Sequence, residues 1–158
     1  MGTREISESI IKRNATWIEA VEKTLADLGD PALTKGVMKV AGKECAQQIL
    51  EECQKILGKN PETVDELLEA TDVRRRKQLK LSALWERQDN TALLRIGECG
   101  CSLVRAGLAR PNPIHCLCTV GMFERIFSAV CRGPVRVEVI KTIGSGNDAC
   151  EFTVHFEE

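Results

Sequence analysis

The spacing of apolar residues changes near residue 80, and this change constrains the fold more than any other feature of the sequence. Before it, apolar side chains recur every three or four residues, as on one face of a helix. After it, they alternate with polar residues, as in strands buried on one side. The change predicts an α+β fold in one domain, 1–158, with a helical half, 1–78, and a strand-rich half, 79–158.

Three helices are expected in the first half. The first, over residues 4–28, has an apolar stripe predicted to face inward, made of Ile10, Trp17, Val21, Leu25 and Leu28. Gly29 ends it, and Asp30 and Pro31 are typical of the start of the next helix. That second helix, over residues 31–58, has a stripe of residues four apart, namely Leu33, Val37, Ala41, Cys45, Ile49, Cys53 and Leu57. A third helix is predicted over residues 62–77.

The second half predicts an antiparallel sheet made of two hairpins, with the N-terminal helices packed on it. The first hairpin joins residues 81–87 to 91–98 and buries Ala92, Leu94 and Ile96. A short helix over about residues 117–131 separates it from the second hairpin. The second hairpin joins residues 135–139 to 150–156, and places Cys150 on the apolar face of the last strand.

Charge and composition narrow the function. A net charge of −1 argues against nucleic acid as a partner, and the basic run at Arg74–Lys77 is interpreted as a solvent-exposed helix face. We expect no membrane span and no signal peptide, and therefore a cytoplasmic protein. Because thiols stay reduced there, eight cysteines indicate metal binding or thiol chemistry more than disulfides.

Four of the eight cysteines gather in the segment Cys99–Cys118. Two Cys-x-Cys pairs, Cys99 with Cys101 and Cys116 with Cys118, flank a loop with two prolines. In an extended segment the two sulfurs of each pair point to the same side, and thiolates favour zinc or iron–sulfur clusters. These four cysteines are therefore the predicted ligands of a zinc or iron–sulfur centre, beside a small-molecule pocket lined by Cys45 and Cys150.

Two other interpretations remain open. The first is a cysteine-dependent hydrolase with Cys116 or Cys118 as the nucleophile and His115 as the base. Because neighbours in sequence rarely hydrogen-bond through their side chains in a helix, His115 would then have to serve Cys99, Cys101 or Cys45 across the pocket. The other is a structural subunit whose cysteines only pack, since free cysteine is among the most buried residue types.

The segment from Cys116 to Phe156 resembles the C-terminal part of the 4-vinyl reductase-like small-molecule-binding domains. It is most similar to uncharacterised relatives of L-2-amino-thiazoline-4-carboxylic acid hydrolase. The motifs are Cys-Leu-Cys-Thr-Val-Gly at 116–121, Gly-Pro-Val-Arg-Val-Glu at 133–138 and Gly-Asn-Asp-Ala-Cys-Glu-Phe at 146–152. The resemblance implies an α+β fold around a ligand pocket, often in a homodimer, and a hydrolase that opens a cyclic thiazoline-like or amide-like substrate.

In zinc-binding members of that group, the resemblance matches Cys116 and Cys150 to two of the metal ligands. The two intermediate positions fall near Val139 and Thr142, which cannot supply a thiolate or a carboxylate, so Cys99, Cys101 and Cys118 are the expected replacements. The leading prediction is a cytoplasmic module, such as a sensor, that binds a metal and a small molecule.

Overall fold

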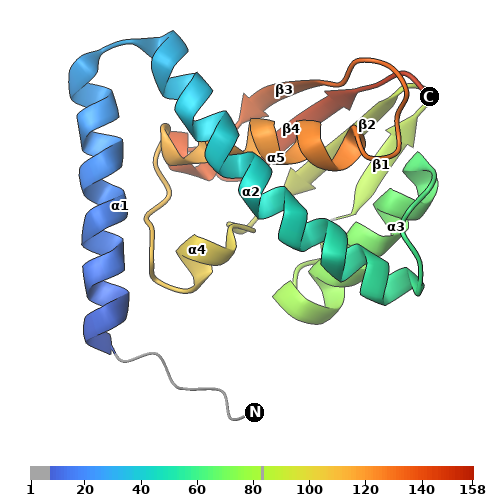
Figure 1. Cartoon of the computed structure of the whole chain (residues 1–158), viewed down its shortest axis with the longest axis horizontal. Helices are drawn as coiled ribbons and strands as arrows, with labels where there is room; N and C mark the ends of the chain where they lie inside the picture. The colour runs from blue at the N-terminus through green and yellow to red at the C-terminus, as the bar shows by residue number, and fades with distance from the viewer. Residues whose placement is uncertain (1–7, 83) are drawn as a thin grey trace.

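The computed structural model describes residues 8–82 and 84–158 and confirms the predicted α+β fold (Figure 1). Helices pack on one antiparallel sheet, and a short helix separates its two hairpins. The helices are α1 (Glu8–Leu28), α2 (Pro31–Leu57), α3 (Val64–Arg74), α4 (Ser102–Arg105) and α5 (Cys118–Phe127), with short helical turns η1 (Arg75–Leu79), η2 (His115–Leu117) and η3 (Ile143–Ser145). The strands are β1 (Trp85–Gln88), β2 (Thr91–Ile96), β3 (Arg136–Lys141) and β4 (Cys150–His155).

The junction between α1 and α2 follows the predicted capping chemistry. The Asp30 carboxylate accepts the backbone N–H groups of Ala32 and Leu33, each at 3.0 Å, and Pro31 occupies the first turn of α2. Gly58 ends α2 with φ of 75°, a left-handed conformation that glycine adopts without strain. The start predicted for the first helix, residue 4, lies outside the described residues.

The sheet has the order β1-β2-β4-β3, and all its pairs are antiparallel. Each predicted hairpin therefore forms, and the two join through β2 and β4, where Leu94 faces Phe152 and Ile96 faces Cys150. Ala92, Leu94 and Ile96 are buried, as predicted. The core continues into an aromatic cluster of Trp85, Phe123, Phe127, Phe152 and Phe156.

Helices α2 and α5 cross at unusually short range because glycine lies at both contact points. A Cβ atom on Gly42 would lie 1.8 Å from the carbonyl oxygen of Cys118, and a Cβ on Gly121 would lie 2.0 Å from that of Lys39. Lys39 and Glu124 add an ion pair at 2.8 Å beside the crossing. The mid-helix glycine of α2 therefore serves close helix packing, which brings the start of α5 next to Cys45.

The inward face predicted for α1 was wrong for four of its five residues. Leu25 is buried, but Ile10, Trp17, Val21 and Leu28 are exposed, with Trp17 at 68% and Leu28 at 61%. The face on the body contains Glu22 and Leu25, together with the half-buried Ile11, Ala15 and Ile18. Helix α1 has two adjacent apolar stripes, and periodicity cannot tell which of them meets the core.

The stripe predicted for α2 was also wrong in its first half. Leu33, Val37 and Ala41 are exposed, whereas the next residue round the helix is buried at each turn: Thr34, Met38, Gly42 and Ala46. The close approach of α5 at Gly42 decides which side of α2 faces inward. Cys53, further along the stripe, is fully buried as predicted.

Two further differences concern the segments that flank the first hairpin. Arg75, predicted on an exposed basic face, is buried over the ring of Trp85 at 5.1 Å and pairs with Asp72 at 2.7 Å. Arg74 is half-buried and pairs with Glu52. Helix α4, within the segment taken as a loop, was not predicted because four residues are too few to show a helical period.

Candidate functional site

A cavity of about 130 Å³ lies between the sheet and the helices. Its walls come from α2, α3, η1, β2, the Cys99–Ser102 segment, α5 and β4. Most of the lining is apolar and includes Leu81, Leu94, Ile96, Phe123 and Phe152. An apolar cavity of roughly 150 Å³ holds a group the size of benzene, so this one suits a small apolar group.

Six of the eight cysteines line this cavity. They are the four proposed as metal ligands, Cys99, Cys101, Cys116 and Cys118, and the two assigned to a ligand pocket, Cys45 and Cys150. All eight cysteines are free thiols. The other two cysteines pack in the hydrophobic core: Cys53 is fully buried there, and Cys131 packs against the edge of the core.

One thiol of this set is part of a chain of polar contacts. The Cys101 Sγ lies 3.4 Å from Nε2 of His115, and Nδ1 of the same ring lies 2.5 Å from Oε1 of Glu22. His115 is only 4% exposed and Glu22 only 6%. A half-buried thiol, an imidazole and a carboxylate in this order form the arrangement that activates a cysteine nucleophile in acyl-transfer enzymes.

Asn112 fixes the geometry of this chain. Its side-chain oxygen accepts the backbone N–H of His115 at 2.8 Å, and its amide nitrogen donates to Oε2 of Glu22 at 2.6 Å. The local sequence explains this arrangement. An asparagine side chain often accepts the backbone N–H of the residue three positions later, here His115, and Pro113 restricts the backbone between them. Asn112 thus aligns the histidine and the carboxylate with each other.

The surroundings of Cys101 favour its thiolate. Burial opposes ionisation and is the strongest influence, but the contact with His115 and the nearby amides of Val104 and Leu103 outweigh it and lower the pKa of Cys101. The contact with Cys101, opposed by burial and assisted by Glu22, raises the pKa of His115 to about 9. The contact therefore shifts both groups toward the ion pair of a thiolate and an imidazolium.

The other seven thiols are held in the neutral form. Burial, with the neighbouring sulfurs of Cys101 and Cys45 acting in the same direction, raises the pKa of Cys118 to about 12. Burial also raises the pKa of Cys53 to about 11. It is the main cause of a raised pKa for Cys45, Cys99, Cys116, Cys131 and Cys150.

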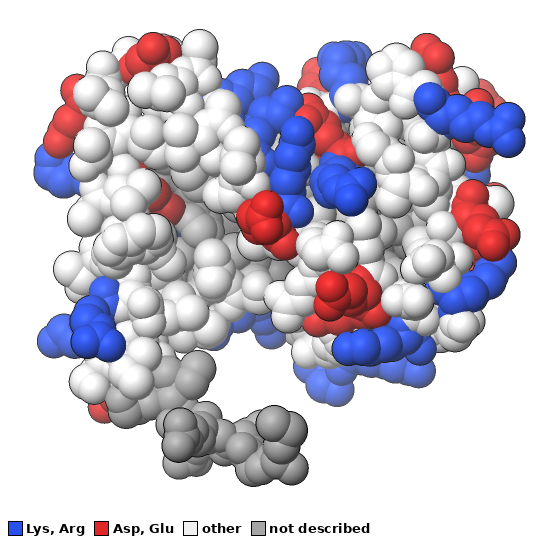
Figure 2. Space-filling model, viewed as in Figure 1, with Lys and Arg blue, Asp and Glu red and all other residues white. Residues whose placement is uncertain are grey.

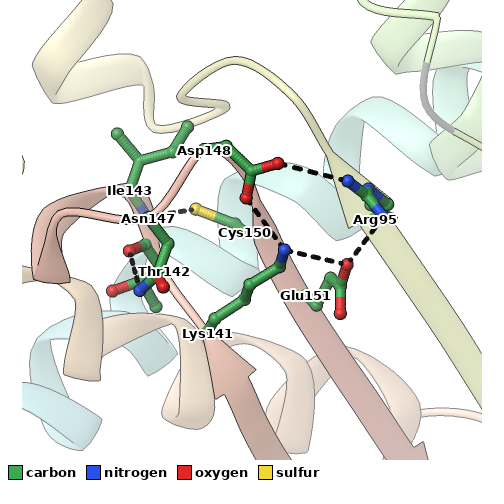
Figure 3. A network of polar contacts seen from close by, with 8 residues as sticks. All are labelled: Arg95, Lys141, Thr142, Ile143, Asn147, Asp148, Cys150 and Glu151. Carbon is green, nitrogen blue, oxygen red and sulfur yellow. Dashed lines mark hydrogen bonds and ion pairs between the residues drawn. The ribbon is translucent and has the colours of Figure 1, made fainter.

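Cys150 is held by the turn that joins β3 to β4 (Figure 3). The backbone N–H of Ile143 donates to its sulfur at 3.3 Å. Figure 3 also shows Lys141 and Arg95 between Asp148 and Glu151, with Lys141 Nζ 2.8 Å from Asp148 and Arg95 3.1 Å from Glu151. Cys150 therefore lines the cavity as a fixed, neutral wall residue on a turn braced by ion pairs.

Cys116 and Cys118 lie at η2 and the start of α5. The Cys116 sulfur packs so closely on Gly144 that a Cβ at residue 144 would lie 2.6 Å from it. The two nitrogens of the His115 ring contact Cys101 and Glu22, and not the sulfur of Cys116 or Cys118. Of the three partners that sequence reasoning left for His115, the structure selects Cys101.

Sequence reasoning missed Glu22 and Asn112. Glu22 is a charged residue between two apolar positions of the same helix face, Ile18 and Leu25, and such an interruption is a signal for a buried functional carboxylate. It was overlooked because the other stripe of α1 was assigned to the core. Asn112 has no signal of its own beyond a turn-forming Asn-Pro pair.

The fit of a metal to this site can be judged from the donors. Among residues 8–82 and 84–158, no group of three or more His, Cys, Asp or Glu side chains is arranged to hold a metal ion. As they lie, the thiols of Cys99, Cys101, Cys116 and Cys118 do not form such a group. The zinc or iron–sulfur centre stays a prediction, which elemental analysis tests.

Comparisons with known proteins place the chain in context. The model of a family of unknown function (DUF6144) matches residues 3–158. No curated protein matches. A crystal structure of trafficking protein particle complex subunit 3 from Naegleria fowleri, covalently bound to palmitic acid, is similar with a TM-score of 0.58 and 14% identity, over 94% of this chain and 95% of that one. This likeness shows the fold alone.

None of the described helices is long and apolar enough to cross a membrane.

Proposed function

The chain belongs to the DUF6144 family, a family of unknown function, and we propose that it is a cysteine-dependent hydrolase of small activated acyl compounds. The observation that carries this proposal is the contact chain from Cys101 through His115 to Glu22, at 3.4 and 2.5 Å. The proposal keeps the reaction class of the predicted hydrolase and its base, His115. It moves the nucleophile from Cys116 or Cys118 to Cys101.

The reaction would begin with an attack by the Cys101 thiolate on the carbonyl carbon of the substrate. A carbon–sulfur bond forms, the bond from the carbonyl to its leaving group breaks, and the His115 imidazolium gives its proton to that group. The product of this step is an S-acyl cysteine. Glu22 accepts the Nδ1–H of His115, which holds the ring with Nε2 toward the sulfur.

Water would complete the cycle. The neutral imidazole takes a proton from a water molecule while the water oxygen attacks the thioester carbonyl, and the carbon–sulfur bond breaks to restore the thiolate and imidazolium. The acid is released. The proton that left with the leaving group is replaced by one from water, so the site returns to its starting state and no oxidant or metal is required.

The cavity sets the class of substrate. Its apolar lining beside Cys101 and its volume of about 130 Å³ suit a short or cyclic apolar acyl group. Thioesters and the thiazoline-like or amide-like rings of the sequence prediction both offer such a carbonyl. The trafficking-complex subunit of similar fold is covalently bound to palmitic acid, which supports an acyl group as the kind of ligand considered.

The test uses intact-protein mass spectrometry on the full chain incubated with a series of acyl thioesters from acetyl to octanoyl. We expect an adduct on Cys101 for the short members, and turnover to the free acid that Cys101→Ser abolishes. Cys131→Ser, at a thiol outside the cavity, is the matched control and should retain both. Acylation at another cysteine, or equal turnover by Cys101→Ser, would refute the proposal.

The predicted small-molecule ligand, homodimer and cytoplasmic location remain parts of this proposal. The exposed apolar stripe of α1 supports a dimer, and eight free thiols support a reducing compartment. The subunit of similar fold belongs to a protein complex, which supports assembly with another chain.

A further inference from the structure

Helix α1 supplies Glu22 to the site, although few of its side chains pack against the rest of the protein. Glu22 and Leu25 are its only fully buried residues among those described. Figure 1 shows α1 diverging from α2 after the turn at Gly29, along the loop that carries Asn112 and His115. Glu22 contacts Asn112 and His115, and Glu19 pairs with Arg110 of the same loop at 3.1 Å. The position of the catalytic imidazole therefore depends on a weakly anchored helix.

The face of α1 adjacent to the buried one is apolar and exposed. Ile10, Trp17, Val21 and Leu28 are each more than a third exposed. A hollow of about 280 Å³, lined by Trp17, Ala20, Val21, Thr24 and Leu25, lies on this face. Figure 2 shows mostly uncharged residues over α1, with acidic and basic side chains along its outer edge in this view. A connected apolar face of this kind marks an interaction site.

The spacing of this stripe suits pairing with a second copy of α1. The residues Ile10, Trp17, Val21 and Leu28 are separated by seven, four and seven positions, a pattern that reads the same in both directions. A second α1 running antiparallel therefore sets Ile10 against Leu28 and Trp17 against Val21, twice by symmetry. In this register Arg13 lies within about one turn of Asp27 of the second copy, so the flanking charges are complementary.

We propose that two copies of the chain pair through the exposed α1 stripe and that this pairing holds Glu22 on His115 and so completes the catalytic site. Val21 and Glu22 are consecutive residues, about 100° apart on the helix, so one faces the second copy while the other faces the histidine. The inference rests on the proposed role of Glu22 in the hydrolase site. It adds a second copy of the chain as the partner. It also makes activity depend on dimerisation, since α1, and with it Glu22, would be less ordered in the monomer.

The test compares the full chain with Trp17→Glu by light scattering and by the rate of Cys101 alkylation at pH 7. We expect the wild-type chain to have twice the 17.5 kDa mass of one chain, and Trp17→Glu to be monomeric with alkylation slowed at least about fivefold. Ile140→Glu, at an exposed apolar residue of β3, is the matched control and should stay dimeric and fully reactive. A second probe is Arg13→Asp, which should weaken the dimer and recover with Asp27→Arg.

The outcomes separate the two proposals. A monomeric wild-type chain, or a dimeric Trp17→Glu, overturns the interface. A monomeric Trp17→Glu with undiminished alkylation overturns the coupling but leaves the hydrolase intact. Glu22→Gln tests the site itself, because it should slow alkylation while leaving the mass unchanged; no effect there would refute the role of Glu22 and leave the interface to be judged by mass alone.

Discussion

At the scale of single residues, the same side-chain type has very different chemistry at neighbouring positions. Cys101 and Cys118 line one cavity, yet the pKa of the first is lowered and that of the second is raised to about 12. Both are half-buried, and this partial loss of contact with water by itself disfavours a thiolate. The difference is the imidazole of His115, which contacts only one of them. Reactivity in this protein is therefore assigned by a partner and not by exposure.

This contrast predicts the order of thiol reactivity. At pH 7, iodoacetamide should label Cys101 at least about ten times faster than any other cysteine, because only the thiolate reacts and each pKa unit changes its population about tenfold. Peptide mass spectrometry at timed intervals measures each site. Similar rates at all eight cysteines would argue for the packing interpretation.

The same pair predicts a pH dependence. In the wild-type chain, Cys101 should lose less reactivity than the other cysteines as pH falls from 9 to 7, since its pKa is lowered whereas theirs are raised. In His115→Gln the main stabilising contact is lost and burial raises the pKa, so reactivity at pH 7 should fall at least about tenfold and recover above pH 9. An unchanged profile in His115→Gln would contradict the ion pair.

At the scale of elements, the crossing of α2 and α5 sets the depth of the site. Two glycines let the backbones touch, so α5 places Cys118, Met122 and Phe123 on the cavity wall. Helical period alone favours the neighbouring stripe of α2, which contains larger apolar residues. Backbone contact at Gly42 overrides that preference, because no side chain at this position fits below Cys118.

Substitution at this crossing should therefore be costly. Gly42→Ala should lower the free energy of unfolding by about 3 kcal/mol, since the added Cβ meets backbone atoms that cannot rotate away. Gly36→Ala, on the same helix with open space around it, should raise that free energy by about 0.5–1 kcal/mol. Urea unfolding followed by circular dichroism measures both. Equal effects of the two changes would contradict the packing of α2 on α5.

At the scale of the whole molecule, stability is distributed unevenly around the site. The sheet, α5 and the inner part of α2 share one core in which Phe127, Leu94 and Val154 are fully buried. The cavity lies within this core, whereas the carboxylate that orients His115 comes from α1, outside it. Cys101, the proposed nucleophile, lies in the loop between β2 and α4, and the carboxylate that contacts its histidine lies on α1.

Hydrogen exchange should display this division. In dilute protein, amides in the first half of α1 are expected to exchange fastest among the helices longer than two turns, and those of α5 and β4 slowest. Raising the protein concentration should protect α1 selectively if two copies pair there. Exchange in α1 as slow as in α5 at every concentration would contradict the weak anchoring of this helix.

The sequence by itself determined the elements and their order. The caps at Asp30 and Gly58, the alternation in β2 and β4 and the glycine turns are local signals, so the α+β class, the two hairpins and the burial of Ala92, Leu94 and Ile96 could be predicted. The cysteine pattern likewise marked the segment that lines the cavity. These features depend on interactions within a few residues, which periodicity and turn chemistry report directly.

Only the tertiary structure decided which stripe of each long helix meets the core and which thiol meets the histidine. Ile10 and Ile11 are equally apolar, and the choice between their faces depends on where α1 lies against the loop 106–114. The contacts from Glu22 to His115 and from His115 to Cys101 span 93 and 14 residues. Such contacts arise from the packing of distant segments, whose free energy is shared by the whole core and leaves no local pattern in the chain.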